Sequence, residues 1–382
     1  MARMAWFRFL SFVAAVSSVF PAPLEADSQA RSPGVAHIVA PDGSARADFI
    51  TTGATAASFW VKDRKGHFRD ILLGFDDYTL YSSDKDGHPY FGPVVGRYAN
   101  RIRNGEFTIN GKTYETPKNE GNNTLHGGTN GFERREWKMI YHSSNTVVFT
   151  MLDPNGTNGF PGDVRTTVTY TLENRATWKV SMIARASEKT PIMLSGHHYW
   201  NLEAFQETQD LSGHHAQFMA SKYIATDGKL IPTGELADVN NTPMDFRSGR
   251  VVGPSINTTA EAQYCGTDCV GYDNAWVFDN NDGKSSVMSF WSQNSGIKMD
   301  ITTNQPAVQI YSCNGLWNAK TPIPRKKSQG GPSTVYDNHS CIVVEAEGYI
   351  DGINNPQWGV NQIYDATRPY VWESTYRFST IA

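Results

Sequence analysis

A strong excess of charge of either sign is missing from this 382-residue sequence. Its 34 lysines and arginines nearly balance 38 aspartates and glutamates, which gives a formal net charge of −4. Nucleic acids and anionic membranes bind proteins through clustered basic residues, and such a balance does not favour that kind of contact. We therefore expect neither of them as a partner.

Long apolar runs are almost absent too. The one candidate, residues 9–20 (FLSFVAAVSSVF), follows two arginines and is too short to span a bilayer comfortably. We expect residues 1–26 to be a signal peptide that is cleaved near Ala22 or Ala26, an uncleaved anchor being the alternative. No later segment is long and apolar enough to span a membrane. The sequence thus predicts a secreted protein with no membrane contact after cleavage.

Cysteine is scarce, with four residues in the whole chain: Cys265, Cys269, Cys313 and Cys341. In an oxidising compartment these could form two disulfides, with three possible connectivities. A metal site at Cys265 and Cys269 is the alternative, but no histidine lies near that pair in the sequence. Five glycosylation sequons agree with export, and they start at Asn122, Asn155, Asn240, Asn257 and Asn338.

Helical periodicity is weak and limited to Ala204–Leu211, whereas strand patterns run through the chain. Asn110-Gly111, between alternating apolar and polar residues, predicts a hairpin over Phe107–Tyr114. The other expected strands are Val147–Met151, Thr166–Leu172, Trp178–Ala184, Lys298–Thr302, Ala307–Ser312 and Cys341–Glu347. We expect residues 27–382 to form one all-β domain, a sandwich of large antiparallel sheets.

One polar loop rich in glycine and proline, Thr321–Ser333, separates two of the expected strands. We expect this loop either to border a functional site or to be an ordinary solvated part of the surface.

Several short segments near strand ends gather polar side chains that could do chemistry. Taken singly they are weak signals, because a lone histidine or strand glutamate is more often structural than catalytic. In Val343–Glu347 the alternation places Glu345 and Glu347 on one face of a strand. The segments are Gly96–Ile102 (GRYANRI), Asn122–Gly128 (NNTLHGG), Gly196–Leu202 (GHHYWNL), Gly271–Asn274 (GYDN), Gln305–Ser312 (QPAVQIYS) and Glu345–Asn354 (EAEGYIDGIN).

Together and in this order, the segments resemble the aldose 1-epimerases, also called galactose mutarotases. The resemblance covers roughly residues 45 to 380, and GRYANRI with LHGG is its most specific part. It implies a β-sandwich (supersandwich) of the galactose-mutarotase type with an open pocket. It also implies His197 as general acid and Glu345 as general base. The positions that match sugar-binding residues are Asn100, Arg101, His126, Tyr199, Asp273 and Gln309.

Three other histidines compete with His197 for the acid role, because Ser-Gly-His-His occurs at 195–198 and again at 212–215. His197 is preferred, since Tyr-Trp-Asn-Leu follows it as in the family. His198 would point to the opposite face of a strand, and His214 and His215 are expected to be structural. Trp200 could stack on a sugar, but core packing is the favoured role.

The chain departs from the family pattern at five positions, which we expect to touch the pocket wall. They bear on sugar choice more than on reaction type. Gly196, His198, Asn274, Glu347 and Ile350 stand where the family has Asn, Ser, His, Gln and Pro.

The implied reaction opens and recloses the ring of a free aldose. A base removes the proton of the C1 hydroxyl while an acid protonates the ring oxygen, and no metal or organic cofactor is required. We expect the carboxylate and the imidazole on opposite sides of the sugar ring. Asp273 is expected to favour protonated His197, and Glu347 to raise the pKa of Glu345 by like-charge repulsion.

Other readings stay open at this point. A secreted carbohydrate-binding protein without catalysis could use the same scaffold, although both His197 and Glu345 are retained. A sugar-phosphate epimerase would need an added cationic site, which Arg97, Arg103 or Arg325–Lys327 could supply. A polysaccharide lyase or hydrolase is a further alternative. We expect a small-molecule sugar as the partner and a monomer or weak homodimer.

Overall fold

The computed structural model describes residues 34–83 and 89–381, so the expected signal peptide lies outside the described residues. The described residues cluster as one compact unit. The expected boundaries of the single domain, residues 27 and 382, remain a prediction. No helix of the described residues is long and apolar enough to cross a membrane.

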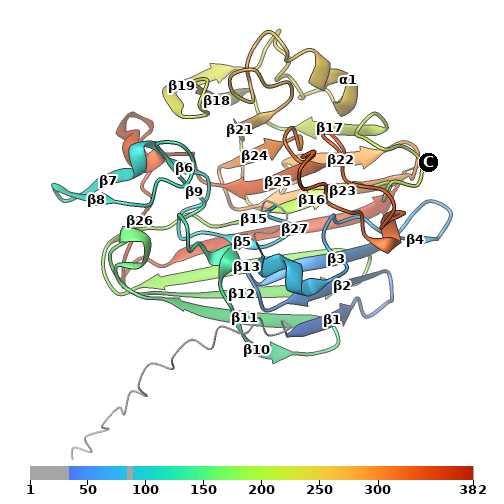
Figure 1. The fold of residues 1–382 in the computed structure, drawn as a ribbon, viewed down its shortest axis with the longest axis horizontal. Coiled ribbons are helices and arrows are strands. Elements are labelled where there is room, and N and C mark those ends of the chain that lie inside the picture. The colour runs from blue at the N-terminus through green and yellow to red at the C-terminus, as the bar shows by residue number, and fades with distance from the viewer. Residues whose placement is uncertain (1–33, 84–88, 382) are drawn as a thin grey trace, which may run out of the picture. The chain divides into compact units, whose positions relative to one another are not determined.

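The largest sheet has nine antiparallel strands in the order β10-β11-β12-β13-β27-β23-β22-β17-β20 (Figure 1). Its strands span Lys138–His142 (β10), Thr146–Asp153 (β11), Val164–Glu173 (β12), Thr177–Ala186 (β13), Tyr370–Thr380 (β27), Ile297–Thr303 (β23), Met288–Ser292 (β22), His214–Phe218 (β17) and Arg250–Val251 (β20). Buried and less buried residues alternate along β12 and most of β13, so one face of the sheet is turned to the core.

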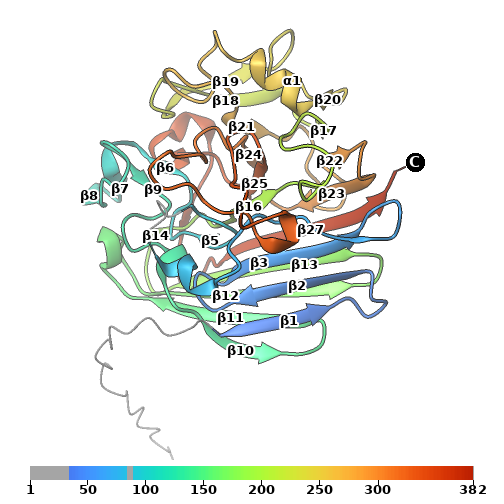
Figure 2. The ribbon, with the colours of Figure 1, turned by 45° about the vertical axis from the view of Figure 1, so that its right-hand side comes forward.

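Two further sheets pack on this one (Figure 2). The six-stranded sheet runs in the order β16 (His198–Trp200), β25 (Ile342–Glu347), β24 (Ala307–Tyr311), β21 (Asp273–Val277), β18 (Lys222–Thr226) and β19 (Pro232–Asp238). The four-stranded sheet consists of β1 (Val35–Val39), β2 (Ala45–Ile50), β3 (Thr55–Lys62) and β4 (Phe68–Asp70). All six of the separately expected strands form, each within two residues of its expected ends, which confirms the all-β sandwich.

Short paired strands and turns complete the fold. The pairs are β14 (Thr190–Pro191) with β26 (Ile363–Tyr364), β15 (Ser195–Gly196) with β5 (Val94–Val95), β6 (Arg101–Ile102) with β9 (Thr124–Leu125), and β7 (Glu106–Ile109) with β8 (Lys112–Glu115). The β7–β8 hairpin is the one expected from Asn110-Gly111, whose φ angles of 52° and 79° both lie in the left-handed region. The 3-10 helices are Tyr78–Ser82, Arg103–Gly105, Phe132–Arg134, Thr157–Gly159, Lys327–Gln329, Gly352–Asn354 and Pro356–Trp358.

The expected helical tendency at Ala204–Leu211 is wrong. Ala204 and Phe205 have φ angles of 47° and 60°, which an α-helix does not contain. The carboxylate of Glu203 instead accepts the backbone N–H of Thr208 at 2.8 Å and closes a turn. The one α-helix of the described residues, α1, spans Val252–Asn257 and is too short to show a period in the sequence.

Tryptophan side chains fill the space between the sheets. Trp200 is fully buried and lies 6.2 Å from Trp178 and 5.8 Å from Tyr376, measured between ring centroids. This confirms core packing, and not sugar stacking, as the role of Trp200.

Both expected disulfides form, as Cys265–Cys269 and Cys313–Cys341. This selects one of the three connectivities. The alternative metal site at Cys265 and Cys269 is wrong, since the disulfide uses both sulfur atoms.

The loop Thr321–Ser333 does not border the cavity described below, and it is not simply solvated. Lys326 is buried with its Nζ 2.7 Å from Asp70 Oδ2. Gln329 donates from Nε2 to the carbonyl oxygens of Asp70 and Leu72 at 2.7 and 2.9 Å. The loop therefore fastens the end of β4. The expectation that it borders the functional site is wrong, and the expectation of a solvated loop holds only for its exposed residues, such as Lys327 and Ser333.

A buried arginine joins the GRYANRI segment to a distant turn. The Arg97 guanidinium donates to Asp153 Oδ2 at 2.6 Å and to the carbonyl oxygens of Pro161 and Gly162 at 2.8 and 3.0 Å. Arg97 is 1% exposed, so its charge is compensated by Asp153 and by these carbonyl groups. It therefore has a structural role and is not available to bind a phosphate group.

Replacing Arg97 should destabilise the fold. Arg97→Met removes one of the two arginines that pair with buried Asp153, the other being Arg135, and leaves the carbonyl groups of Pro161 and Gly162 without this donor. We expect a loss of about 3 kcal/mol in the free energy of unfolding. The midpoint of urea unfolding measures this loss. Arg165→Met, at an exposed position of β12, is the matched control and should change stability by less than about 0.5 kcal/mol. Equal effects of the two substitutions would contradict the role of Arg97.

Candidate active site

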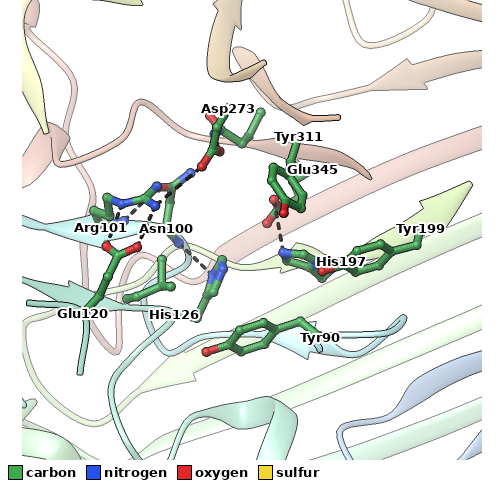
Figure 3. Close-up of a pocket in the computed structure, with 12 residues that line it drawn as sticks. Tyr90, Asn100, Arg101, Glu120, His126, His197, Tyr199, Asp273, Tyr311 and Glu345 are labelled. Carbon is green, nitrogen blue, oxygen red and sulfur yellow. Dashed lines mark hydrogen bonds and ion pairs between the residues drawn. The ribbon is translucent and has the colours of Figure 1, made fainter. Parts of the chain in front are cut away.

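A cavity of about 290 Å³ is lined by residues in or next to β6, β9, β16, β21, β24 and β25 (Figure 3). All eight site residues expected from the sequence line it: Asn100, Arg101, His126, His197, Tyr199, Asp273, Gln309 and Glu345. The four lining residues that sequence reasoning missed are Tyr90, Glu120, Leu125 and Tyr311. Tyr311 follows Gln309 by two residues on β24 and could have been inferred from the alternation, whereas nothing in the sequence marks Tyr90.

His197 and Glu345 lie side by side. β16 pairs with β25 in a register that sets His198 opposite Val344, so His197 comes next to Glu345. Their Nε2 and Oε1 atoms are 3.5 Å apart (Figure 3). The expectation that the two groups flank a sugar ring from opposite sides is therefore wrong, because neighbouring strands of one sheet carry them.

Burial governs the protonation of this pair. It lowers the pKa of His197 to about 3. Burial, together with the negative charges of Glu347 and Asp273, raises the pKa of Glu345 well above its ordinary value. Both shifts favour the uncharged forms, so without a ligand the one proton that the two groups share resides on Glu345.

Asp273 pairs with Arg101 and not with His197, so the expectation that it favours protonated His197 is wrong. Its Oδ2 lies 3.6 Å from Arg101, and its Oδ1 accepts a hydrogen bond from Gln309 Nε2 at 2.5 Å. Arg101 also donates to both oxygens of Glu120 at 2.7 Å. Arg101 is thus held between two carboxylates at the end of the cavity away from His197 (Figure 3).

Asn100 and His126 are joined by two reciprocal hydrogen bonds. The backbone N–H of Asn100 donates to His126 Nδ1 at 3.1 Å, and the backbone N–H of His126 donates to the carbonyl of Asn100 at 3.0 Å. Both residues have left-handed backbones, with φ angles of 59° and 50°. Because Nδ1 accepts, neutral His126 carries its proton on Nε2, which makes Nε2 a donor.

That tautomer decides whether the cavity suits a metal ion. His126, His197 and Glu345 offer ligand atoms within 4.8 Å of one another, a set that resembles a metal site. A metal would need an unprotonated Nε2 on His126, and hence a proton on Nδ1 facing the N–H of Asn100. The two donors would then oppose each other, so the residues present do not fit a metal.

Glu347 lies behind the cavity. It is fully buried, and its Oε1 accepts a hydrogen bond from Asn100 Nδ2 at 3.0 Å. Burial raises the pKa of Glu347 to about 8. The expectation that Glu347 raises the pKa of Glu345 agrees with this arrangement, although burial is the larger cause.

None of the five departures from the family pattern lines the cavity, but Glu347 and Asn274 contact its wall as expected, through hydrogen bonds to Asn100 and Asp273. His198 points away from His197, into the core, with its ring centroid 4.9 Å from that of Trp178. A Cβ atom on residue 196 would lie 2.3 Å from the His198 ring, so Gly196 makes the room that His198 needs. Ile350 packs in a core cluster with Ile224 and Ala275.

His214 and His215 have the structural roles expected. The Nε2 of buried His214 accepts the backbone N–H of Leu202 at 3.0 Å. The ring of His215 stacks on Trp291, with centroids 5.2 Å apart. Neither residue lines the cavity.

Comparison with known proteins agrees with the site. A model of the aldose 1-epimerase family matches residues 37–377. A probable aldose 1-epimerase of Arthroderma benhamiae is 40% identical over 372 residues, 87% of this chain and 84% of that protein. The galactose mutarotase of Rattus norvegicus is 35% identical over 311 residues, 81% of this chain and 84% of that protein.

A solved structure with the same fold is the aldose epimerase homologue of C. elegans. It superposes with a TM-score of 0.78 and 27% identity, over 92% of this chain and 100% of that one. The family match over most of the sequence, together with relatives above 30% identity, shows that this chain belongs to the aldose 1-epimerase family.

Proposed function

We propose that the chain, an isomerase by its family, interconverts the α and β anomers of free aldoses, with Glu345 as general base and His197 as general acid. The observation that carries this assignment is the 3.5 Å separation of His197 Nε2 and Glu345 Oε1 in one cavity. O1, which must lose a proton, and the ring oxygen O5, which must gain one, are bonded to the same carbon. An acid and a base that act on them together must therefore lie side by side.

The reaction needs no other reactant. Glu345 takes the proton of O1 while His197 gives a proton to O5, and the C1–O5 bond breaks to leave an aldehyde at C1. Rotation about the C1–C2 bond presents the other face of the aldehyde to O5. The two proton transfers then run backward, and the ring closes as the other anomer.

His197 and Glu345 together hold one transferable proton at every stage of the reaction. Carboxylate and imidazolium face the closed ring, whereas carboxylic acid and imidazole face the open-chain aldehyde. Burial favours the second, uncharged arrangement at both His197 and Glu345. The same burial that shifts the two pKa values therefore stabilises the open-chain intermediate relative to the ring.

The cavity also offers polar atoms that suit sugar hydroxyls. Asn100, Asp273 and Gln309 line it with amide and carboxylate groups of the kind that bind sugar hydroxyls. Nε2 of His126 adds a donor that suits O5 or a ring hydroxyl.

A sugar phosphate fits the cavity less well. Arg101 is the one lysine or arginine among its lining residues, and Glu120 and Asp273 already contact that guanidinium. A phosphate would meet Glu120, Asp273 and Glu345 without a free cation to balance it. A free, uncharged aldose avoids this repulsion. A protein that only binds sugar would not need an acid and a base in contact.

Removing the acid or the base should abolish most of the activity. Glu345→Gln and His197→Asn each lose one proton-transfer group, and we expect kcat/KM to fall about 10²–10⁴-fold. Polarimetry on freshly dissolved α-D-glucose and α-D-galactose measures the rate. His215→Asn, at a histidine outside the cavity, should keep full activity. The proposal would be overturned if the wild-type protein failed to accelerate the mutarotation of any common aldose. It would also be overturned if His197→Asn were as active as His215→Asn.

Glu347→Gln should move the pH profile of kcat/KM to lower pH. The variant keeps an oxygen for Asn100 but removes a carboxylic acid whose pKa is about 8. Above that pH, the Glu347 charge in wild type holds the shared proton on the His197–Glu345 pair. Without it the proton leaves sooner, so we expect the basic limb to shift down by about one unit. Glu106→Gln, at an exposed position, is the control and should leave the profile unchanged. An unchanged profile in Glu347→Gln would contradict the effect of Glu347 on the pair.

We also propose that the protein is exported by its first 26 residues. The two disulfides support this, because they persist in oxidising compartments. Expression in a eukaryotic host should release protein whose N-terminal residue follows Ala22 or Ala26, as read by N-terminal sequencing. Retention inside the cell with Met1 intact would contradict export.

A further inference from the structure

Tyr90 packs on both histidines that line the cavity. Its ring centroid lies 4.8 Å from that of His126 and 5.4 Å from that of His197. The two imidazoles are 5.1 Å apart and stand at 87° to each other. Figure 3 shows the Tyr90 ring below both of them. Ring pairs attract each other at these separations, so the three side chains form one aromatic cluster.

The backbone next to Tyr90 is bonded to that of His197. The N–H of Gly92 donates to the carbonyl of His197 at 2.9 Å, and the N–H of His197 donates to the carbonyl of Pro93 at 2.9 Å. The buried ring of Phe91 anchors the same segment in the core. The fold therefore sets the place of the Tyr90 ring relative to the imidazole of His197.

The orientation of the two imidazoles matters because each must present one nitrogen to the sugar. A histidine ring can turn about its Cβ–Cγ bond. A backbone hydrogen bond to Nδ1 fixes the ring of His126. Nε2 of His197 lies 3.5 Å from Glu345, which is too long for a strong hydrogen bond. The orientation of His197 therefore depends on ring packing, which Tyr90 and Tyr199 provide with centroids 5.4 and 5.1 Å away.

Tyr90 also separates His197 from solvent. The His197 side chain is buried, whereas Tyr90 is half-buried and lines the cavity beside it. The Tyr90 ring is thus part of the boundary between the imidazole and water. Removing this ring would open a route for water to the imidazole.

We propose that Tyr90 is a positioning residue for proton transfer, whose ring holds the imidazole of His197 toward the sugar and keeps water away from it. The inference rests on the proposed function and deepens it by adding a residue that acts through the general acid. The hydroxyl group of Tyr90 has no part in this role, which distinguishes it from a role in binding sugar hydroxyls.

This role predicts a change in pH dependence when the ring is lost. The titratable groups that face His197 are Glu345 on β25, His126 after β9, Tyr199 on β16 and Tyr90 itself. Burial lowers the pKa of His197 to about 3, and the backbones of His197 and Tyr90 oppose part of this shift. Tyr90→Ala keeps that backbone but admits water. The imidazolium then becomes more stable, the His197–Glu345 pair takes up a second proton at higher pH, and the acid limb of kcat/KM rises.

The experiment measures kcat and KM by polarimetry on α-D-glucose across the acid limb. We expect Tyr90→Ala to lower kcat about tenfold, because a misplaced acid transfers its proton less efficiently. The acid limb should move up by about one pH unit. Tyr90→Phe keeps the ring and should restore kcat to within about threefold of wild type, with the acid limb in place. Tyr141→Ala, at an exposed tyrosine of β10 outside the cavity, is the control and should change neither quantity.

Tyr90→Leu covers the case in which Tyr90→Ala does not fold, because leucine keeps an apolar side chain without a planar ring. Its kcat should be about fivefold below that of Tyr90→Phe. The proposal is overturned if Tyr90→Phe is as slow as the alanine or leucine variant, if only KM changes, or if the acid limb stays in place when the ring is lost. Failure of the proposed function is distinct, because the wild-type protein would then accelerate the mutarotation of no aldose.

Discussion

The pair of hydrogen bonds between Asn100 and His126 is the constraint on which the site depends. It ties the GRYANRI segment to the LHGG segment, and it requires both residues to hold left-handed backbones. It orients the His126 ring and sets its tautomer. The side chain of Asn100 then extends the same tie to Arg101, whose backbone N–H it accepts at 2.9 Å, and to Glu347. Four groups of the site thus take their positions from one contact between two loops.

Around that frame, the site gathers more acidic groups than basic ones. Glu120, Asp273, Glu345 and Glu347 lie within reach of one guanidinium, that of Arg101. Burial resolves the excess of negative charge by favouring protonation, most strongly at Glu345. A catalytic carboxylate that is reluctant to ionise suits a reaction in which it must take up a proton and return it. Burial of Glu345 therefore accounts both for its raised pKa and for its suitability in the proposed proton transfer.

Much of the fold could be predicted because strands with one buried face must alternate. β11, β12 and β13 were visible in the sequence for that reason, and the hairpin at Asn110-Gly111 for its turn chemistry. The eight site residues followed from the resemblance. Their mutual contacts did not, since strand register sets His197 beside Glu345, and long-range packing brings Asp273 to Arg101. The turn after Glu203 escaped because it depends on two residues in left-handed conformations that are rarely seen outside glycine and asparagine.

Gly196 and His198 limit the order in which this segment can have changed. With a side chain at 196, an imidazole at 198 collides at 2.3 Å, whereas glycine at 196 with a small residue at 198 leaves only a gap. A history that began from asparagine and serine, the family pattern, could lose the side chain at 196 first and fill the space later. The opposite order passes through a protein in which the buried His198 ring must move to make room for the side chain at 196. The substitutions at 196 and 198 are therefore coupled. Once histidine occupies position 198, a side chain can no longer return to position 196 without displacing that ring.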